Sequence, residues 1–249
     1  MNIGLYQSAA SLSALERWQD VVSQNITSAQ NTGYRKRTVG FSTLNSGEWQ
    51  PDSRGRVGRD GGIPAVFTSV RAGISYSTGE NQPTRRELDV AIQGEGFFEV
   101  QLADGSRAYT RSGEFRLRPD RTLVTAGGCE VMSDGGSPIV LLPGGGPVTI
   151  NGDGTLFKGD TQLGRIAVQT FTNPAALMPV AGGMFKPAAN AGLTPVEKPQ
   201  LLQGYLEGSN VAPLREMVDL VLISRAYEAN QKIISTVDQQ MQKTLDALG

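Results

Sequence analysis

Hydrophobic residues recur every three or four positions near both ends of the chain, whereas in the middle they alternate with polar residues. A spacing of three and four places the N-terminal set on one face of a helix, which we predict over residues 3–30. The positions on this face are Leu5, Ser8, Leu12, Leu15, Gln19, Val22, Ile26 and Ala29, and six of the eight are apolar. We expect Gly33 to end the helix, because glycine readily adopts the left-handed conformation of a helix C-terminus.

A second amphipathic helix is predicted over residues 211–248. Its seam consists of Leu220, Ile223, Tyr227, Asn230, Ile234, Val237, Met241, Thr244 and Leu248, and seven of the nine are apolar. A seam repeated over about four heptads is typical of a coiled coil. Asn210 is the expected N-cap, with Pro213 and Glu216 in the first turn. Asn230 either sets the register of the seam or is a tolerated polar residue.

The length of the second helix indicates an intermolecular role. At 1.5 Å per residue it would extend roughly 50 Å, which is too long to be covered within a small globular domain. We therefore expect part of its seam to contact another chain. The alternative is that both terminal helices are ordinary core helices of one domain.

The middle of the chain has the period of β-strands. Residues 88–92, 98–102 and 115–117 alternate between apolar and polar side chains, and residues 166–171 form a further expected strand. The turn at residues 151–154 predicts a hairpin between residues 148–150 and 155–157. Short strands separated by many glycines favour a twisted β-domain, a sandwich or a partial barrel.

These patterns together predict an α+β fold in which paired, discontinuous coiled-coil helices from both termini accompany a central, mostly β domain. The expected helical assembly domain comprises residues 1–35 with 207–249, and the β-rich domain comprises residues 87–206. An extended segment, residues 36–86, connects them, and we expect a loop at 42–64. The prolines in residues 178–200 predict a second irregular connection.

Composition excludes most catalytic chemistry. The 249 residues include no histidine, which removes Ser-His and Cys-His nucleophiles and the commonest metal ligand. P-loop, complete GxGxxG and GxSxG patterns do not occur. Asn151, Asp153 and Thr155 partly match a calcium loop, but Leu156 stands where that pattern requires glycine, which favours a plain hairpin. We predict no catalytic, cofactor-binding or metal site.

The single cysteine and a basic cluster have structural interpretations. Cys129 allows no intrachain disulfide, and its neighbours predict a partly buried residue in a strand or turn rather than a reactive thiol. Arg35, Lys36 and Arg37 follow the first helix and are expected on a solvated face, or in contact with acidic neighbours in an assembly. A net charge of −1 and the lack of interleaved aromatic residues argue against nucleic-acid binding.

Targeting signals are not evident in the sequence. Residues 1–12 lack the basic and apolar regions of a secretory signal, and no stretch approaches the 18 apolar residues of a membrane span. This pattern is typical of a cytosolic protein, or of one exported with its N-terminus uncut.

Several segments resemble the bacterial flagellar basal-body rod and hook proteins. Residues 25–35, Asn-Ile-Thr-Ser-Ala-Gln-Asn-Thr-Gly-Tyr-Arg, are similar to the N-terminal motif of that family, and residues 88–98 to its central motif. Residues 109–115 and 123–128 extend the central match, and residues 204–211 and 225–230 are similar to the C-terminal motif. Ser28 and Asn31 depart from the usual residues of the N-terminal motif. The motif positions singled out are Asn25, Gly33, Tyr34, Gly94, Gly96, Phe97, Gly208, Ser209 and Asn210.

The resemblance implies a structural subunit of the basal-body rod, which crosses the periplasmic space, and not an enzyme. Such a protein is exported by the flagellar type III apparatus without cleavage of a signal. Its partners would be copies of itself and neighbouring rod proteins, joined through a helical inner layer with the β-domain further out. The short connection at residues 42–80 and the chain length favour the proximal rod protein, although the C-terminal motif resembles the distal one equally well.

The residues expected at the assembly interface are the seam positions Leu5, Leu12, Leu15, Val22, Ile26, Leu220, Ile223, Tyr227, Asn230, Ile234, Val237, Met241 and Leu248. Two alternatives belong to other classes. A soluble coiled-coil binding module would form a closed oligomer, and an enzyme would need a carboxylate pair in the β-domain. No spacing of acidic residues singles out such a pair.

Overall fold

The computed structural model describes the backbone of residues 3–49, 63–144 and 146–246. Side chains are described for the same residues except 3–6, 44–49, 63–68 and 245. The described residues form two compact units. The helical unit contains those of 1–27, 37–73 and 212–249, and the β unit contains those of 28–36 and 74–211.

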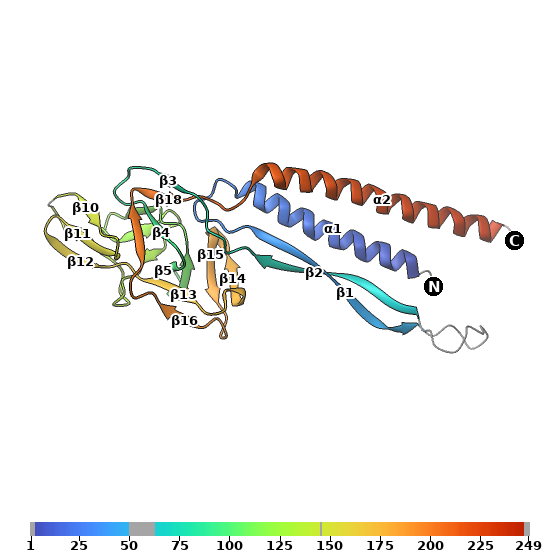
Figure 1. Ribbon diagram of the computed structural model, residues 1–249, viewed down its shortest axis with the longest axis horizontal. Coiled ribbons are helices and arrows are strands. Elements are labelled where there is room, and N and C mark those ends of the chain that lie inside the picture. The colour runs from blue at the N-terminus through green and yellow to red at the C-terminus, as the bar shows by residue number, and fades with distance from the viewer. Residues whose placement is uncertain (1–2, 50–62, 145, 247–249) are drawn as a thin grey trace. The chain divides into compact units, whose positions relative to one another are not determined.

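Two helices and two long strands make up the helical unit. Helix α1 (Ile3–Thr27) and helix α2 (Pro213–Asp246) run antiparallel and side by side (Figure 1). Strands β1 (Arg37–Trp49) and β2 (Ile63–Ile74) pair in a two-stranded sheet next to α1. The ring of Trp18 on α1 meets that of Phe41 on β1 edge to face, with centroids 5.4 Å apart. Neither helix, over its described residues, is long and apolar enough to cross a membrane.

Both predicted helices are present, with different ends. Helix α1 stops at Thr27, six residues before Gly33, so the expectation that Gly33 caps it is wrong. The predicted N-cap of α2 is also wrong. The helix begins at Pro213, so the residue in the N-cap position is Ala212 and not Asn210. The carbonyl of Ala212 accepts the first hydrogen bonds of the helix, from the amides of Arg215 (3.0 Å) and Glu216 (3.2 Å). Gly33 and Asn210 instead belong to the β unit.

Short strands and two single-turn 3-10 helices make up the β unit. They are β3 (Asn81–Pro83), β4 (Val90–Gln93), β5 (Phe97–Gln101), β6 (Arg107–Thr110), β7 (Phe115–Leu117), β8 (Leu123–Thr125), β9 (Glu130–Val131), β10 (Val148–Ile150), β11 (Thr155–Lys158), β12 (Thr161–Arg165), β13 (Val168–Phe171), η1 (Pro174–Ala176), β14 (Leu177–Val180), η2 (Ala181–Gly183), β15 (Met184–Pro187), β16 (Leu193–Pro195), β17 (Gln200–Gln203) and β18 (Tyr205–Glu207).

One nine-stranded sheet dominates this unit. Its strands follow the order β14-β15-β6-β5-β9-β8-β7, and β13 pairs with both β5 and β16. Strands β10, β11 and β12 form a second sheet, and the pairs β4–β17 and β3–β18 join segments more than 100 residues apart in sequence. Every pairing in the β unit that is assigned a register is antiparallel, as expected for strands connected by tight turns.

Fourteen buried residues form the main core of the β unit, and they come from nine of its strands and from residues 139, 141 and 166 between strands. They are Val90, Ile92, Phe98, Phe115, Leu123, Val131, Ile139, Leu141, Val148, Ile150, Leu156, Ile166, Val168 and Leu201. A second, aromatic cluster contains Phe97, Tyr109, Phe171 and Phe185. Val90, Ala91 and Ile92 are all buried, so both faces of β4 are covered. The alternation predicted for residues 88–92 therefore does not correspond to one buried and one exposed face of the strand.

Several predicted segments differ from the structure. The expected loop at 42–64 is wrong for residues 42–49 and 63–64, which lie in β1 and β2, and residues 50–62 lie outside the described part of the chain. Residues 178–200 contain strands rather than an irregular connection. Residues 28–35 and 207–211 group with the β unit, although both were expected in the helical domain. The hairpin at residues 148–157 is confirmed, since β10 and β11 pair around the predicted turn.

Candidate assembly interface

The two helices are held together by a small hydrophobic core. Leu15 and Val22 on α1 and Ile223 on α2 are buried, and Ile223 has no exposed surface. The partly buried residues packed around them are Trp18, Ile26, Leu220, Ala226 and Tyr227. The structure therefore brings together six of the predicted seam residues: Leu15, Val22, Ile26, Leu220, Ile223 and Tyr227.

Other predicted seam residues lie outside this cluster. Leu12, Ile234 and Val237 are half-buried, and Met241 is exposed. Asn230 is also half-buried, and its side-chain amide donates to the carbonyl of Ala226 in its own helix (3.0 Å). The side chain of Leu5 and the whole of Leu248 lie outside the described residues.

A row of apolar side chains is exposed at the start of α2. We call this set the exposed stripe, and it comprises Leu214, Met217, Val218, Val221 and Leu222. Their spacing of three and four places them on one face of the helix. At about 100° per residue, Leu214 and Ile223 point to opposite sides of α2. The stripe thus faces away from α1, and Leu214 is 81% exposed.

A buried amide connects α1 to both of its neighbours in the helical unit. The side chain of Asn25 donates to a carboxylate oxygen of Glu216 in the first turn of α2 (2.9 Å) and to the carbonyl of Arg37 at the start of β1 (2.9 Å). Its side-chain oxygen accepts from the amide of Arg37 (2.9 Å). Asn25 and Glu216 are each 1% exposed. Asn25 therefore fixes where β1 and α2 begin relative to the end of α1.

Several other motif residues meet within the β unit. We call this meeting point the junction, and it brings together residues 33–36, 75–80 and 207–211. The amide of Gly33 donates to the carbonyl of Glu207 (2.7 Å), and the amide of Asn210 donates to the carbonyl of Tyr34 (3.4 Å). The side-chain oxygen of Asn210 accepts from the amide of Lys36 (2.6 Å), and its amide group donates to the carbonyls of Ser75 (3.0 Å) and Ser77 (2.8 Å). Three distant segments are joined by this one side chain.

Small residues allow the junction segments to approach each other closely. A Cβ atom at Gly79 would lie 2.0 Å from the carbonyl oxygen of Gly208, whose amide donates to the carbonyl of Glu80 (2.9 Å). The hydroxyl of Ser209 accepts from the amide of Val211 (3.2 Å). At Gly33, φ is +67° and a Cβ atom would lie 2.4 Å from the amide nitrogen of Ser112. Larger side chains would push these backbones apart.

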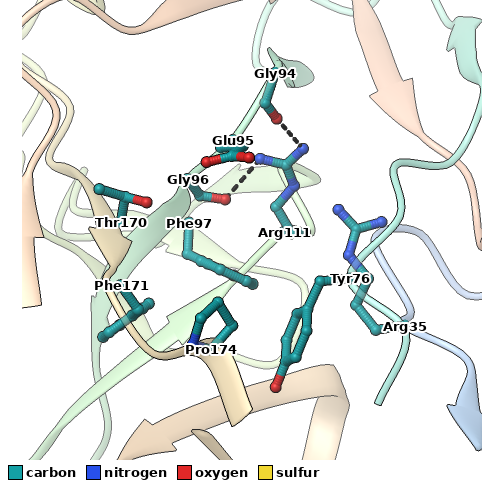
Figure 2. Close-up of a pocket in the computed structure, with 10 residues that line it drawn as sticks. All are labelled: Arg35, Tyr76, Gly94, Glu95, Gly96, Phe97, Arg111, Thr170, Phe171 and Pro174. Carbon is teal, nitrogen blue, oxygen red and sulfur yellow. Dashed lines mark hydrogen bonds between the residues drawn. The ribbon is translucent and has the colours of Figure 1, made fainter. Parts of the chain in front are cut away.

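A buried carboxylate lies between two arginines at the base of the junction. Glu207 contacts Arg35 Nη1 through Oε1 (2.7 Å) and Arg111 Nε through Oε2 (2.8 Å), and all three side chains are at most 2% exposed. Arg111 also donates to the carbonyls of Gly94 and Gly96, both at 2.6 Å (Figure 2). Burial lowers the pKa of Arg111, and the charge of Glu207 opposes that shift.

The position of Arg35 corrects its expected location. It was expected on a solvated face, or in contact with acidic neighbours in an assembly, but the residue is only 4% exposed and contacts a carboxylate of its own chain. Phe97 is buried as well, beneath the guanidinium of Arg111, whose central carbon lies 5.9 Å from the ring centre. Gly94 and Gly96 both have positive φ, of 96° and 129°, as their turns require.

Cys129 is buried, more completely than the partly buried position predicted for it, and its Sγ lies 3.8 Å from Sδ of Met184. Within residues 3–49, 63–144 and 146–246, no three cysteine or acidic residues are grouped as a metal site would need.

Comparison with known proteins now places the chain in a family. The model of the flagellar basal body rod FlgEFG protein C-terminal region matches residues 202–247, and that of the flagellar hook protein FlgE/F/G D1 domain matches residues 91–158. The flagellar basal-body rod protein FlgF of Caulobacter vibrioides is 32% identical over 251 aligned positions, which cover 100% of this chain and 99% of the relative. The chain belongs to the flagellar basal-body rod protein family.

Relatives of two types share this similarity. The flagellar basal-body rod protein FlgG of Borreliella burgdorferi is 32% identical over 95% of both chains. The FlgF protein of Mesorhizobium japonicum is 28% identical over 100% of this chain and 99% of its own length. This rod protein is therefore of the FlgF/FlgG type, as the resemblance of its motifs indicated.

Two structural features of this rod protein were not predicted. The spacing of the exposed stripe is visible in the sequence. The heptad pattern, however, predicts a contact surface on the opposite face of the helix. The ion pairs of Glu207 had no comparable signal. Its partners Arg35 and Arg111 are 172 and 96 residues away, and sequence spacing does not report contacts at that separation.

Proposed function

We propose that this chain is a structural subunit of the bacterial flagellar basal-body rod and polymerises through its terminal helices into the axial drive shaft. The observation that carries the proposal is 32% identity, from end to end, with a flagellar basal-body rod protein. The relatives are named as components of that rod, and rod subunits by their nature assemble with themselves and with other flagellar components.

The exposed stripe supplies the physical basis for assembly. Five neighbouring apolar side chains on one helix face are unfavourable in water, and large apolar patches of this kind mark interaction sites. Four of the five side chains are only 49–60% exposed in the single subunit, so burying each of these against a neighbouring subunit would contribute about 1 kcal/mol. A contact between two different faces, repeated without closing into a ring, generates a helical filament.

The pairing of α1 with α2 would continue as a coiled coil in the assembled rod. The packing seen in the helical unit supports this for residues 15–26 and 220–227. Further along α2 the seam continues with Ile234 and Val237, which are half-buried, and Met241, which is exposed. Helices of neighbouring subunits would cover these positions, together with Leu5, Leu12 and Leu248.

Position and transport complete the proposal. We assign the chain to the proximal, FlgF-type position, because the FlgF relatives match it over 100% of its length and 99% of their own, whereas the FlgG relatives cover 93–97% of it. The subunit would pass through the flagellar type III export apparatus with its N-terminus uncut and assemble in the periplasmic space, between copies of itself and other rod proteins. It would act without catalysis or cofactor.

A substitution in the exposed stripe tests the assembly mechanism. Val218→Asp adds a charge to a residue that is 60% exposed, so the isolated subunit should fold normally. In a strain that lacks its own copy of the gene, we expect this variant to be exported but missing from purified basal bodies, as measured by quantitative mass spectrometry. Gln231→Asp adds the same charge to α2 at an exposed position outside the stripe and should be incorporated normally.

Two results would contradict the proposal. Normal amounts of Val218→Asp in basal bodies would show that the stripe is not an assembly surface, while leaving the family assignment intact. If the unaltered chain were missing from basal bodies, the rod function itself would be wrong, and a soluble coiled-coil binding module would take its place.

A further inference from the structure

The turn between β10 and β11 contains an asparagine followed directly by a glycine, Asn151-Gly152, and no other such pair occurs in the 249 residues. Both residues are exposed. The amide of Asn151 donates to the carbonyl of Thr155, and the amide of Gly154 donates to the carbonyl of Asn151, both at 2.9 Å. The peptide bond that joins Asn151 to Gly152 therefore lies at the surface, in an ordered turn.

Two groups of this pair are free of hydrogen bonds. Across residues 3–49, 63–144 and 146–246, no atom accepts from the backbone amide of Gly152, and none bonds to the side chain of Asn151. An amide that donates no hydrogen bond loses its proton more readily than one that does. An exposed side chain without a partner can rotate between its rotamers. The nitrogen of Gly152 is thus available as a nucleophile, and the side-chain carbonyl of Asn151 is available as its target.

A second exposed asparagine lacks this arrangement. Asn190 is also in a turn, but the amide of the following residue, Ala191, donates to the carbonyl of Ala188 (3.0 Å). The Cβ atom of Ala191 further crowds its backbone nitrogen, whereas Gly152 has no Cβ atom. Asn190 therefore serves as an internal reference for Asn151.

We propose that Asn151 is a site of spontaneous deamidation. The amide nitrogen of Gly152 loses its proton and attacks the side-chain carbonyl carbon of Asn151. The bond from that carbon to the side-chain nitrogen breaks, ammonia leaves with the proton, and a cyclic imide forms. Water then adds to one of the two imide carbonyl carbons and opens the ring. The product is aspartate, or isoaspartate, in which the main chain runs through the former side chain.

The backbone does not require glycine at position 152. Its φ is outside the left-handed region, and an added Cβ atom would meet only the carbonyl oxygen of Leu201, at an ordinary contact distance of 3.8 Å. Gly154 in the same turn has a φ of +88° and does require glycine. Gly152→Ala is therefore a variant that should fold normally and still change the reaction.

The reaction would alter the contact between this turn and β17. The carbonyl of Gly152 accepts from the amide of Leu201 (2.8 Å), and the side chain of Leu201 belongs to the main core. Isoaspartate lengthens the main chain just before Gly152, so that carbonyl would move away from its donor. Both products also add a negative charge close to Asp153. We expect isoaspartate to remove the hydrogen-exchange protection of the Leu201 amide, and Asn151→Asp, which keeps the normal main chain, to retain it.

Peptide mapping by mass spectrometry can follow the reaction in the full-length chain. The peptide that contains Asn151 should gain the mass difference between a hydroxyl and an amino group, and it should separate into two products with the same mass. Because the deprotonated amide is the reacting species, the rate should rise about tenfold for each unit of pH near neutrality. In Gly152→Ala the rate should fall about tenfold, because the added Cβ atom crowds the attacking nitrogen. The peptide that contains Asn190 should stay unchanged over the same time.

The rate in the folded chain, compared with that in urea, decides whether the fold permits the reaction. We expect the two rates to agree within about tenfold, since the turn leaves both groups free. If the reaction needed the chain to unfold, the folded chain would react roughly a thousandfold more slowly or less, and the proposal would be wrong. Equal rates for Asn151 and Asn190, or for the natural chain and Gly152→Ala, would also overturn it. The rod assignment does not depend on these results, since the reaction is measured in the isolated chain.

Discussion

Polar and glycine residues, more than the periodic apolar ones, determine how the segments of this protein are joined. Asn25 connects α1 to β1 and α2, and Asn210 connects residues 36, 75 and 77. These two residues favour one arrangement of the segments, because a buried amide that loses its partners costs about 1–3 kcal/mol for each unsatisfied group. An apolar residue in the same position could pack against many alternative neighbours.

Gly33→Ala should destabilise the β unit strongly. The residue has a φ of +67°, and an added Cβ atom would lie 2.4 and 2.5 Å from backbone atoms of Ser112 and Arg111, which cannot simply rotate away. We expect a loss of about 2–4 kcal/mol in the free energy of unfolding, measured by urea denaturation. Gly128→Ala is the control, because its φ is +82° but nothing lies within 4 Å, so it should cost only about 1 kcal/mol. Equal losses for the two variants would show that the close approach at Gly33 does not affect the free energy of unfolding.

Glu207→Gln should be as damaging, for an electrostatic reason. Removing the only carboxylate that contacts both Arg35 and Arg111 in the described structure leaves two buried positive charges uncompensated, at a cost of about 3–5 kcal/mol. The matched control is Glu130→Gln, which breaks a partly exposed ion pair with Arg118 and should cost much less stability, because solvent screens that pair. Thermal unfolding measured by circular dichroism would compare them. A small loss for Glu207→Gln would mean that its arginines find other acceptors.

Among the elements, the hairpin of β10 and β11 contains a carboxylate whose protonation should change the stability of the turn. Oxygens of Asp153 accept from the amide (3.0 Å) and the hydroxyl (2.9 Å) of Thr155, and these bonds hold the pKa of Asp153 below its usual 3.8. Because the folded pKa is lower than the unfolded one, the stabilisation is complete above the unfolded pKa and disappears as the pH falls through the folded pKa. Acid should therefore weaken this turn.

Asp153→Asn tests that dependence. The variant should be less stable than the natural chain near pH 7, and the difference should shrink as the pH falls from about 5 to about 2. Denaturant unfolding at a series of pH values would measure it, with Asp160→Asn at the next turn as the control. A difference that stays constant over this range would contradict the role of the Asp153 carboxylate.

The elements also show how far sequence patterns reach. The helices and the β10–β11 hairpin were predictable, because a helical period over many residues and a turn with two glycines are local signals. Strands β14, β15 and β16 were missed because Pro179, Pro187 and Pro195 are unusual inside strands. Pro179 is tolerated because β14 is at the edge of its sheet. The junction could not be predicted, since its contacts join residues that are far apart in sequence.

At the scale of the whole molecule, the two units differ in how completely they cover apolar surface. The β unit buries its apolar residues in a core of fourteen side chains with further aromatic clusters. Among its described side chains, the helical unit buries only Leu15, Val22 and Ile223 in its shared cluster and leaves the exposed stripe in solvent. Such a distribution is expected for a subunit in which one part folds by itself and the other is completed by its neighbours.

Two substitutions two residues apart on α2 separate these roles. Ile223→Asp places a charge in the contact between α1 and α2, where the side chain has no exposed surface, and should release both helices from each other. Hydrogen exchange followed by mass spectrometry should then show lost protection in α1 and α2, with protection in the β unit unchanged. Val221→Asp alters a residue that is 51% exposed in the stripe, so protection should remain in both units while assembly into rods is lost. If Val221→Asp also removed protection from α1, the stripe would belong to the fold of the single subunit, and assembly would have to use another surface.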